Sequence, residues 1–143
     1  MNNPFERRRK MDIAELNKRM KSPFWELLNL QIIETNDERV VLKLPVHQGL
    51  TQPYGFVHGG AIATLIDSAI ASLMTCTLKQ HEETVTIEMK VNYLSSTRDK
   101  DLFAEASLVK RGKTISVAMA IVRDVDGKDI AIGTATFFVR KKT

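Results

Sequence analysis

The sequence predicts an α+β fold in which one long apolar helix is surrounded by an antiparallel sheet of about six strands. Residues 60–78 carry a single charge and no proline, and their apolar side chains recur on every side of a helix, as in a helix buried on most sides. Residues 85–139 hold successive alternating segments separated by short turns, which predicts an antiparallel meander. A helix that is apolar all round needs a sheet that curves around it.

Length and composition fit one globular domain. The 143 residues suffice for one domain and are few for two, and 43% hydrophobic with 27% charged residues is ordinary. The only cysteine, Cys76, excludes an internal disulfide and therefore a disulfide-stapled scaffold. The net charge of +4 comes from the two ends, because residues 22–139 hold more acids than bases. We therefore expect no nucleic-acid partner for the body of the protein.

The N-terminal segment is predicted to be helical. Ile13, Leu16 and Met20 lie at helical spacing, which indicates a short amphipathic helix in a basic extension over residues 1–21. Ser22 and Pro23 are then placed to cap and begin a second turn, at the start of a domain that spans residues 22–143. We expect the large apolar residues of this turn to pack onto the core: Phe24, Trp25, Leu27 and Leu28.

Strands are predicted on both sides of the long helix. Residues 30–34 and 40–44 form one pair around a polar turn at 36–38. After the helix, the alternation of residues 85–93 predicts Val85 and Ile87 on the buried face and Thr86 on the polar face. The remaining predicted elements are strands over 102–108, 115–121 and 130–139, with turns at 110–113 and at Asp126-Gly127, a hairpin signal.

Neither a membrane span nor a secretory signal is predicted. Polar residues such as Thr64 and Ser68 dilute the long helix, whereas a span needs about 20 mainly apolar residues. The basic run near the N-terminus is followed by further charges instead of an apolar segment. We therefore expect a cytoplasmic protein.

Two features of the long helix point to chemistry. Asp67 is the only charge in its surroundings, and a carboxylate there resists burial unless a partner or a reaction uses it. His58, Gly59 and Gly60 stand at the helix start, where free N–H groups and the helix dipole favour an anion or a developing oxyanion. The structural alternatives are a solvent-facing carboxylate and an ordinary glycine-rich helix entry.

The spacing of Gly59 and Asp67 predicts a homodimer if both residues are catalytic. The eight positions between them span about 12 Å along a helix. An oxyanion donor and a base or nucleophile must each lie about 3 Å from one reacting group. One helix cannot bring both to the same carbonyl, so two copies of the chain would share each site.

The sequence resembles the acyl-CoA thioesterases of the phenylacetate-pathway (PaaI-like) type, which have the hotdog fold. The resemblance extends over about residues 22–140 and is carried by one motif: Gln52-x-x-Gly55-x-x-His58-Gly59-Gly60-Ala61-x-Ala63-Thr64-Leu65-x-Asp67-x-Ala69. It implies a central helix wrapped by an antiparallel sheet, hydrolysis of an acyl-CoA or aryl-CoA to free acid and CoA, and dimers that pair into tetramers. It also implies that no metal or cofactor is needed.

The resemblance implies a role for each matching residue. Asp67 resembles the acidic catalyst, as nucleophile or as base for a water. The N–H of Gly59 resembles the oxyanion donor, and His58 would bind near the thioester oxygen or hold the loop. Gln52 stands where the family commonly has Asn, and Thr86 aligns with a residue that can orient the attacking water. The acyl pocket would take in side chains of two subunits and of the segment around Phe24 and Trp25.

The phosphates of coenzyme A favour Lys, Arg and backbone N–H groups. The candidates for binding the substrate are Gly60 at the helix start and the cluster Lys110, Arg111, Lys113 and Thr114, whose alternative is a plain charged turn.

Two other functions are compatible with the same residues. One is a non-catalytic acyl-CoA-binding protein, which as a regulator would need a DNA-binding domain larger than residues 1–21. The other is an enoyl-CoA hydratase or dehydratase, in which His58 would work with the acid. The three histidines are scattered and Cys76 has no cysteine partner, so no metal site is predicted.

Overall fold

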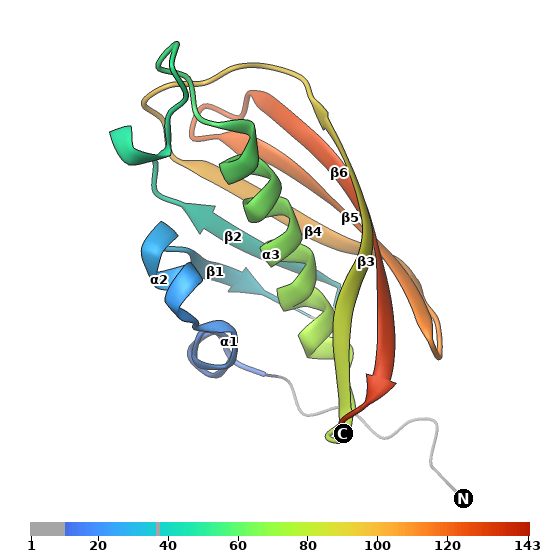
Figure 1. Ribbon diagram of the computed structural model, residues 1–143. Helices are drawn as coiled ribbons and strands as arrows, with labels where there is room; N and C mark the ends of the chain where they lie inside the picture. The colour runs from blue at the N-terminus through green and yellow to red at the C-terminus, as the bar shows by residue number, and fades with distance from the viewer. Residues whose placement is uncertain (1–10, 37) are drawn as a thin grey trace, which may run out of the picture.

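The computed structural model describes residues 11–36 and 38–143 and confirms the α+β prediction (Figure 1). Arg7, Arg8, Arg9 and Lys10 of the predicted basic extension lie outside the described residues. The helices and strands follow in this order: α1 (Ile13–Met20), α2 (Pro23–Leu28), β1 (Gln31–Thr35), β2 (Arg39–Leu44), the 3₁₀ turn η1 (Gln48–Leu50), α3 (Gly59–Thr77), β3 (Glu82–Tyr93), β4 (Leu102–Arg111), β5 (Ile115–Asp124) and β6 (Asp129–Lys141).

The strands form one antiparallel sheet that curves around α3. Their order across the sheet is β1-β2-β4-β5-β6-β3, so β1 and β3 are the edges. Helix α3 contacts β2, β3, β4, β5 and β6 and lies in the concave side of the sheet (Figure 1). Its buried side chains, among them Leu65, Ile66 and Leu73, form one core with the inward residues of the strands. An apolar helix is thus buried by sheet curvature, as the sequence predicts.

The predicted element boundaries differ from the observed ones by a few residues, and two of these differences concern candidate site residues. Helix α3 begins at Gly59, one residue earlier than predicted, because His58 is its N-cap. Lys110 and Arg111 belong to β4, where they pair with Val117 and Ser116, so the turn that follows is shorter than the predicted 110–113.

Strand β3 does not alternate strictly, and the predicted orientation of Thr86 was wrong. The pairing with β6 shifts between Thr86 and Glu88, so Ile87 is an extra, bulged residue. Before the bulge, Thr86 pairs with the inward-facing Phe137, while Val85 and Ile87 are exposed. A bulge reverses which face the alternating side chains occupy. The alternation that holds for residues 89–93 is therefore inverted for residues 85–87.

Helix α1 covers the edge strand β1. Leu16 of α1 is fully buried in the same core as α3. The side-chain amide of Asn17 donates to the carbonyl of Ile32 at 3.1 Å and accepts from its N–H at 3.0 Å. Unpaired edge groups invite pairing with other chains, so this amide protects β1 at that position.

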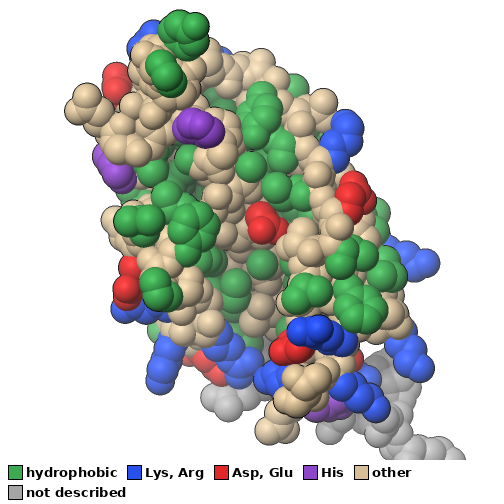
Figure 2. Space-filling model, in the orientation of Figure 1, with side chains coloured by type: hydrophobic (Ala, Val, Ile, Leu, Met, Phe, Trp, Pro, Cys, Tyr) green, Lys and Arg blue, Asp and Glu red, His purple; other side chains and the backbone are tan. Residues whose placement is uncertain are grey.

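One side of α3 is not covered by the sheet. Gly60, Thr64, Asp67 and Ala71 recur at helical spacing and are half-buried or exposed. Figure 2 shows this face, whose middle is mostly hydrophobic or uncharged around an acidic side chain, with Lys and Arg gathered toward the lower end. By length and composition α3 could cross a membrane, but a buried core helix has the same features.

Candidate active site

The amide groups at the start of α3 leave one donor free. His58 accepts a 2.8 Å hydrogen bond from Gly60 N–H on its Nδ1, and its carbonyl accepts from Ala61 and Ile62. Among the described residues, the N–H of Gly59 has no acceptor. A helix N-terminus with a free N–H can stabilise a developing negative charge. The first turn of α3 therefore has the chemistry of an oxyanion site.

A Cβ at either glycine of this turn would closely approach a neighbouring side chain. A Cβ at Gly59 would lie 3.2 Å from the ring of Tyr93, whose hydroxyl donates a 2.9 Å hydrogen bond to the Gly59 carbonyl. A Cβ at Gly60 would lie 2.9 Å from Nδ1 of His58. Tyr93 therefore orients the peptide that precedes Gly60, a contact that sequence reasoning missed because it joins residues 34 positions apart.

Asp67 lies on the uncovered side of α3 and meets Thr86. The hydroxyl of Thr86 donates to Oδ1 of Asp67 at 2.8 Å, and Asp67 is half-buried while Thr86 is exposed. A hydrogen bond to a carboxylate fixes its orientation. Among the described residues, the second oxygen, Oδ2, has no hydrogen-bond partner, which leaves it open to a water or a substrate.

The structure keeps Gly59 and Asp67 apart. Both belong to one continuous helix of 19 residues, so about 12 Å of helix rise lies between them. A single chain thus presents the Gly59 N–H and the Asp67 carboxylate as two well-separated groups.

Gln52 lies in the loop that leads into α3. Its Oε1 accepts from the N–H of Tyr54, and its backbone carbonyl accepts from Gly55. Gly55 has a φ of +81°, which suits glycine. The next amides are held by neighbouring segments, because Val57 donates to the carbonyl of Thr97 and His58 to that of Leu50, both at 2.8 Å.

Arg98 clamps the same loop from the β3–β4 connection. Its guanidinium lies 3.9 Å from the centroid of the Phe56 ring and donates to the carbonyl of Tyr54 at 3.0 Å. A Cβ at Gly55 would lie 2.6 Å from its Nη1. Guanidinium groups stack well on aromatic rings, and here the stacking holds the loop tip. No short-range signal in the sequence marks Arg98 for this contact.

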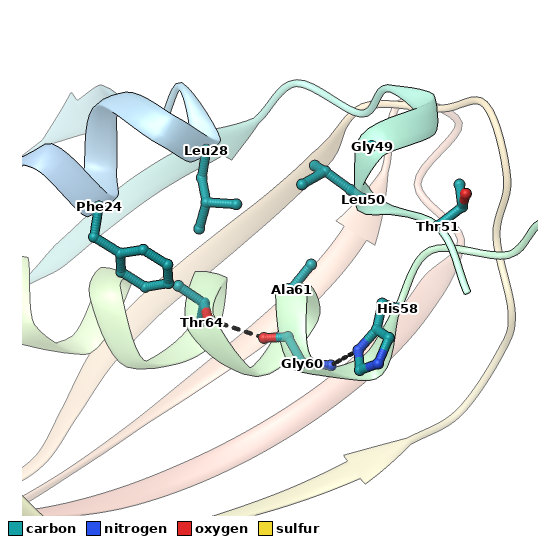
Figure 3. Close-up of a pocket in the computed structure, with 9 residues that line it drawn as sticks. All are labelled: Phe24, Leu28, Gly49, Leu50, Thr51, His58, Gly60, Ala61 and Thr64. Atoms are coloured by element: carbon teal, nitrogen blue, oxygen red, sulfur yellow. Dashed lines mark hydrogen bonds between the residues drawn. The ribbon is translucent and has the colours of Figure 1, made fainter. Parts of the chain in front are cut away.

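A pocket of about 320 Å³ opens beside the start of α3 (Figure 3). Residues of α2, the η1 turn and α3 line it: Phe24, Leu28, Gly49, Leu50, Thr51, His58, Gly60, Ala61 and Thr64. Phe24 was expected here. Trp25, also expected, lines a different hollow, on the side of α1.

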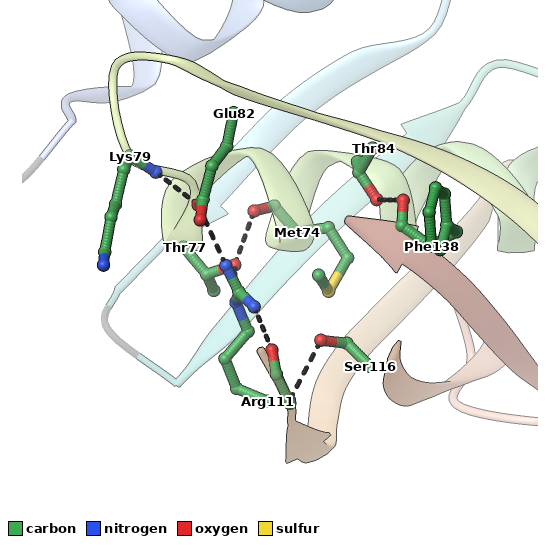
Figure 4. Close-up of polar contacts among 9 residues, drawn as sticks. Met74, Thr77, Lys79, Glu82, Thr84, Arg111, Ser116 and Phe138 are labelled. Atoms are coloured by element: carbon green, nitrogen blue, oxygen red, sulfur yellow. Dashed lines mark hydrogen bonds and ion pairs between the residues drawn. The ribbon is translucent and has the colours of Figure 1, made fainter. Parts of the chain in front are cut away.

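The residues predicted to bind the phosphates of CoA do not form one exposed cluster. Arg111 is held inside the chain: its Nε donates to Thr77 at 3.0 Å, its Nη2 pairs with Glu82 at 3.1 Å, and its Nη1 donates to the carbonyl of Gly112 (Figure 4). Lys110, Lys113 and Thr114 are exposed.

Glu82 completes this ion pair. Burial alone would raise the pKa of Glu82, but the hydrogen bond from Lys79 N–H and the charge of Arg111 outweigh it, so the pKa lies below its ordinary value. The pair ties the end of α3 to the start of β3 and the end of β4. Within the described residues, no three His, Cys, Asp or Glu side chains gather as a metal site would require.

Comparison with known proteins identifies the family. Residues 54–131 match the model of the "Thioesterase superfamily". The chain is 34% identical over 125 residues to ComA2 of Bacillus subtilis, named "Putative esterase", covering 86% of this chain and 98% of that one. It is 28% identical over 112 residues to "Acyl-coenzyme A thioesterase 13" of Mus musculus, covering 77% and 79%.

The fold matches as well. A crystal structure of a mutant of the thioesterase PA1618 from Pseudomonas aeruginosa superposes with a TM-score of 0.89 at 26% identity, covering 94% of this chain and 98% of that one. The chain therefore belongs to the thioesterase superfamily, has its hotdog fold and is a thioester hydrolase.

Proposed function

We propose that this protein hydrolyses acyl-CoA thioesters at sites that two copies of the chain share. The observation that carries the proposal is the separation of the free Gly59 N–H from Asp67 on one rigid helix. Each group has the chemistry of one half of a thioesterase site, and one chain cannot apply both to one carbonyl. The mouse relative named for acyl-CoA hydrolysis supports CoA as the thiol.

In this proposal the Gly59 N–H of one subunit holds the thioester oxygen, and Asp67 of the other acts on the carbonyl carbon. As a base, Asp67 takes a proton from water while the water oxygen bonds to that carbon. The carbon–sulfur bond then breaks, and the thiolate leaves and takes up the proton as CoA. As a nucleophile, an Asp67 oxygen bonds to that carbon, the carbon–sulfur bond breaks and CoA leaves as a thiolate; water then hydrolyses the resulting anhydride, which releases the acid and restores the Asp67 carboxylate. The Thr86 hydroxyl holds Oδ1 in either case.

We place the contact between the two copies at β3. This strand of 12 residues is a sheet edge, and its exposed side chains include Val85, Ile87 and Tyr93. A long exposed strand edge that carries large apolar side chains is suited to a second copy of the chain. Pairing of dimers into tetramers, cytoplasmic location, and independence from metal, cofactor and nucleic acid stay predictions.

Mixing two inactive variants tests the shared site. Asp67→Asn removes the base, and Gly59→Pro removes the N–H at a helix position that tolerates proline. Gly59→Ala is the matched control, because it adds a similar Cβ near Tyr93 and keeps the N–H. We expect both single variants to release little thiol from acyl-CoA. Mixed and reassociated, they should recover about a quarter of the wild-type rate, since half of the pairs carry one intact site.

Two results would contradict the proposal. If the mixture stays as inactive as its components while the wild type reassociates with full activity, each site lies within one chain. If Asp67→Asn keeps near wild-type turnover, Asp67 is not the catalyst. A wild-type protein that adds water to an enoyl-CoA without releasing thiol would support the hydratase alternative instead.

A further inference from the structure

Helix α2 leaves two large apolar side chains uncovered. Trp25 and Leu28 are buried, as predicted, but Phe24 is 53% and Leu27 is 73% exposed, against the prediction that all four pack on the core. A helix of six residues offers only one face to the core, so the other face must point outward. The two exposed side chains differ in one respect: Phe24 lines the pocket beside α3 and Leu27 does not.

The pocket presents mostly apolar groups. Phe24 and Leu28 form the wall on the α2 side, and Leu50 and Ala61 lie across from them (Figure 3). The hydroxyl of Thr64 is turned to its own helix, where it donates to the Gly60 carbonyl at 2.9 Å. Among the described residues, no Asp, Glu, Lys or Arg side chain lines it, and the His58 imidazole already accepts a hydrogen bond from Gly60. Such a lining suits a hydrocarbon group and not a phosphate.

The pocket lies where the acyl group of a thioester bound at the Gly59 N–H would lie. His58 and Gly60 line it and flank Gly59, whose N–H is free. A thioester whose oxygen accepts from this N–H has its carbonyl carbon at the edge of the pocket. One substituent of that carbon can then enter the space between α2 and α3, beneath the Phe24 ring, which points from α2 toward Thr64 (Figure 3).

The volume sets the size of the group. A closed apolar cavity of about 150 Å³ holds one benzene molecule; this pocket of about 320 Å³ is open on one side and has room for about twice that amount of carbon. Given the proposed function, we infer that Phe24 is a specificity-determining residue that walls this pocket against acyl or aryl groups longer than about twelve carbon atoms. The Phe24 ring forms the outer wall of the pocket, and acyl chains that are too long for the pocket collide with it.

Removal of this wall tests the inference. Phe24→Ala is compared with Leu27→Ala, which removes an exposed apolar side chain from the same helix without touching the pocket. Thiol release is measured with saturated acyl-CoAs of increasing length and with one-ring and two-ring aryl-CoAs. We expect Phe24→Ala to raise kcat/KM for the longest chains relative to the best wild-type substrate by about tenfold, a typical effect of pocket size on specificity. Leu27→Ala should keep the wild-type profile.

A variant with a larger side chain in the pocket is expected to have the opposite effect on acyl-chain preference. Ala61→Leu, on the facing wall, should shift the preference to shorter acyl groups. The inference is overturned if Phe24→Ala and Leu27→Ala give the same profile, or if Phe24→Ala keeps the wild-type preference while its urea unfolding shows an intact fold. A wild-type protein that turns over none of the thioesters overturns the proposed function itself, which is a different result.

Discussion

Thr86 donates a 2.8 Å hydrogen bond to Oδ1 of Asp67, which joins strand β3 to the middle of helix α3 across 19 positions of sequence. This contact exists because the bulge at Ile87 turns Thr86 toward the helix. It leaves one carboxylate oxygen fixed and the other available, an arrangement that a base or a nucleophile needs.

Thr86→Val is expected to lower kcat for acyl-CoA hydrolysis by about tenfold to a hundredfold, because a hydrogen bond to a charged group contributes about 1.5–3 kcal/mol. Thr86→Ser keeps the hydroxyl and should retain most of the rate. Steady-state thiol release measures both variants. Equal rates for the valine and serine variants would mean that the hydroxyl does not orient Asp67.

The Arg111–Glu82 pair is expected to stabilise the fold. Arg111→Met leaves the half-buried Glu82 carboxylate without its cation and should lower the free energy of unfolding by about 2 kcal/mol, between the values for exposed and buried pairs. Urea unfolding of the single and double variants with Glu82→Gln gives the coupling. Arg140→Met, at an exposed ion pair with Glu83, is the control and should change little.

The same pair should make stability depend on pH in the acid range. The pKa of Glu82 is lower in the folded protein than in the unfolded chain. The folded state therefore gains stability above the ordinary glutamate pKa and loses it as pH falls through the lowered pKa. Glu82→Gln should weaken the decrease in the free energy of unfolding between pH 7 and pH 3, measured by urea unfolding. An unchanged slope would show that other carboxylates set it.

The nucleotide of CoA is expected to contact Lys110 and Lys113, because Arg111 is occupied inside the chain. Replacing both lysines by glutamine should raise KM for acyl-CoA several-fold, with little change in kcat, and the effect should fade at high salt. An acyl-pantetheine thioester lacks the nucleotide and should not distinguish the variant from the wild type. Lys128→Gln, also exposed, serves as the control.

Arg98→Met is expected to loosen the loop that leads to Gly59. The guanidinium stacks on Phe56 and bonds Tyr54, so its loss should speed amide exchange at Gly55 and Val57 and lower kcat by about tenfold, as misplaced groups do. Arg123→Met removes an exposed ion pair with Asp129 and should leave both unchanged. Wild-type exchange rates in Arg98→Met would show that backbone bonds alone hold the loop.

Much of the fold could be predicted because its signals are local. The composition of residues 60–78 marks the buried helix. Ser22 and Pro23 mark the start of α2, and Ser22 caps this helix as predicted by accepting a hydrogen bond from Trp25 N–H. Asp126-Gly127 marks the β5–β6 hairpin, in which Gly127 has a φ of +80°. Each of these features depends on neighbours in sequence.

The sequence by itself determined the order of the elements, the buried helix and the candidates Asp67 and Gly59, since periodicity, capping and an isolated charge are properties of neighbouring residues. Only the tertiary structure decided which residues meet them. Thr86 reaches Asp67 through a bulge, Tyr93 orients Gly59, and Arg111 turns to Glu82 instead of solvent. These contacts join strands and helices distant in sequence, and strand register and sheet curvature, which no local pattern encodes, bring them together.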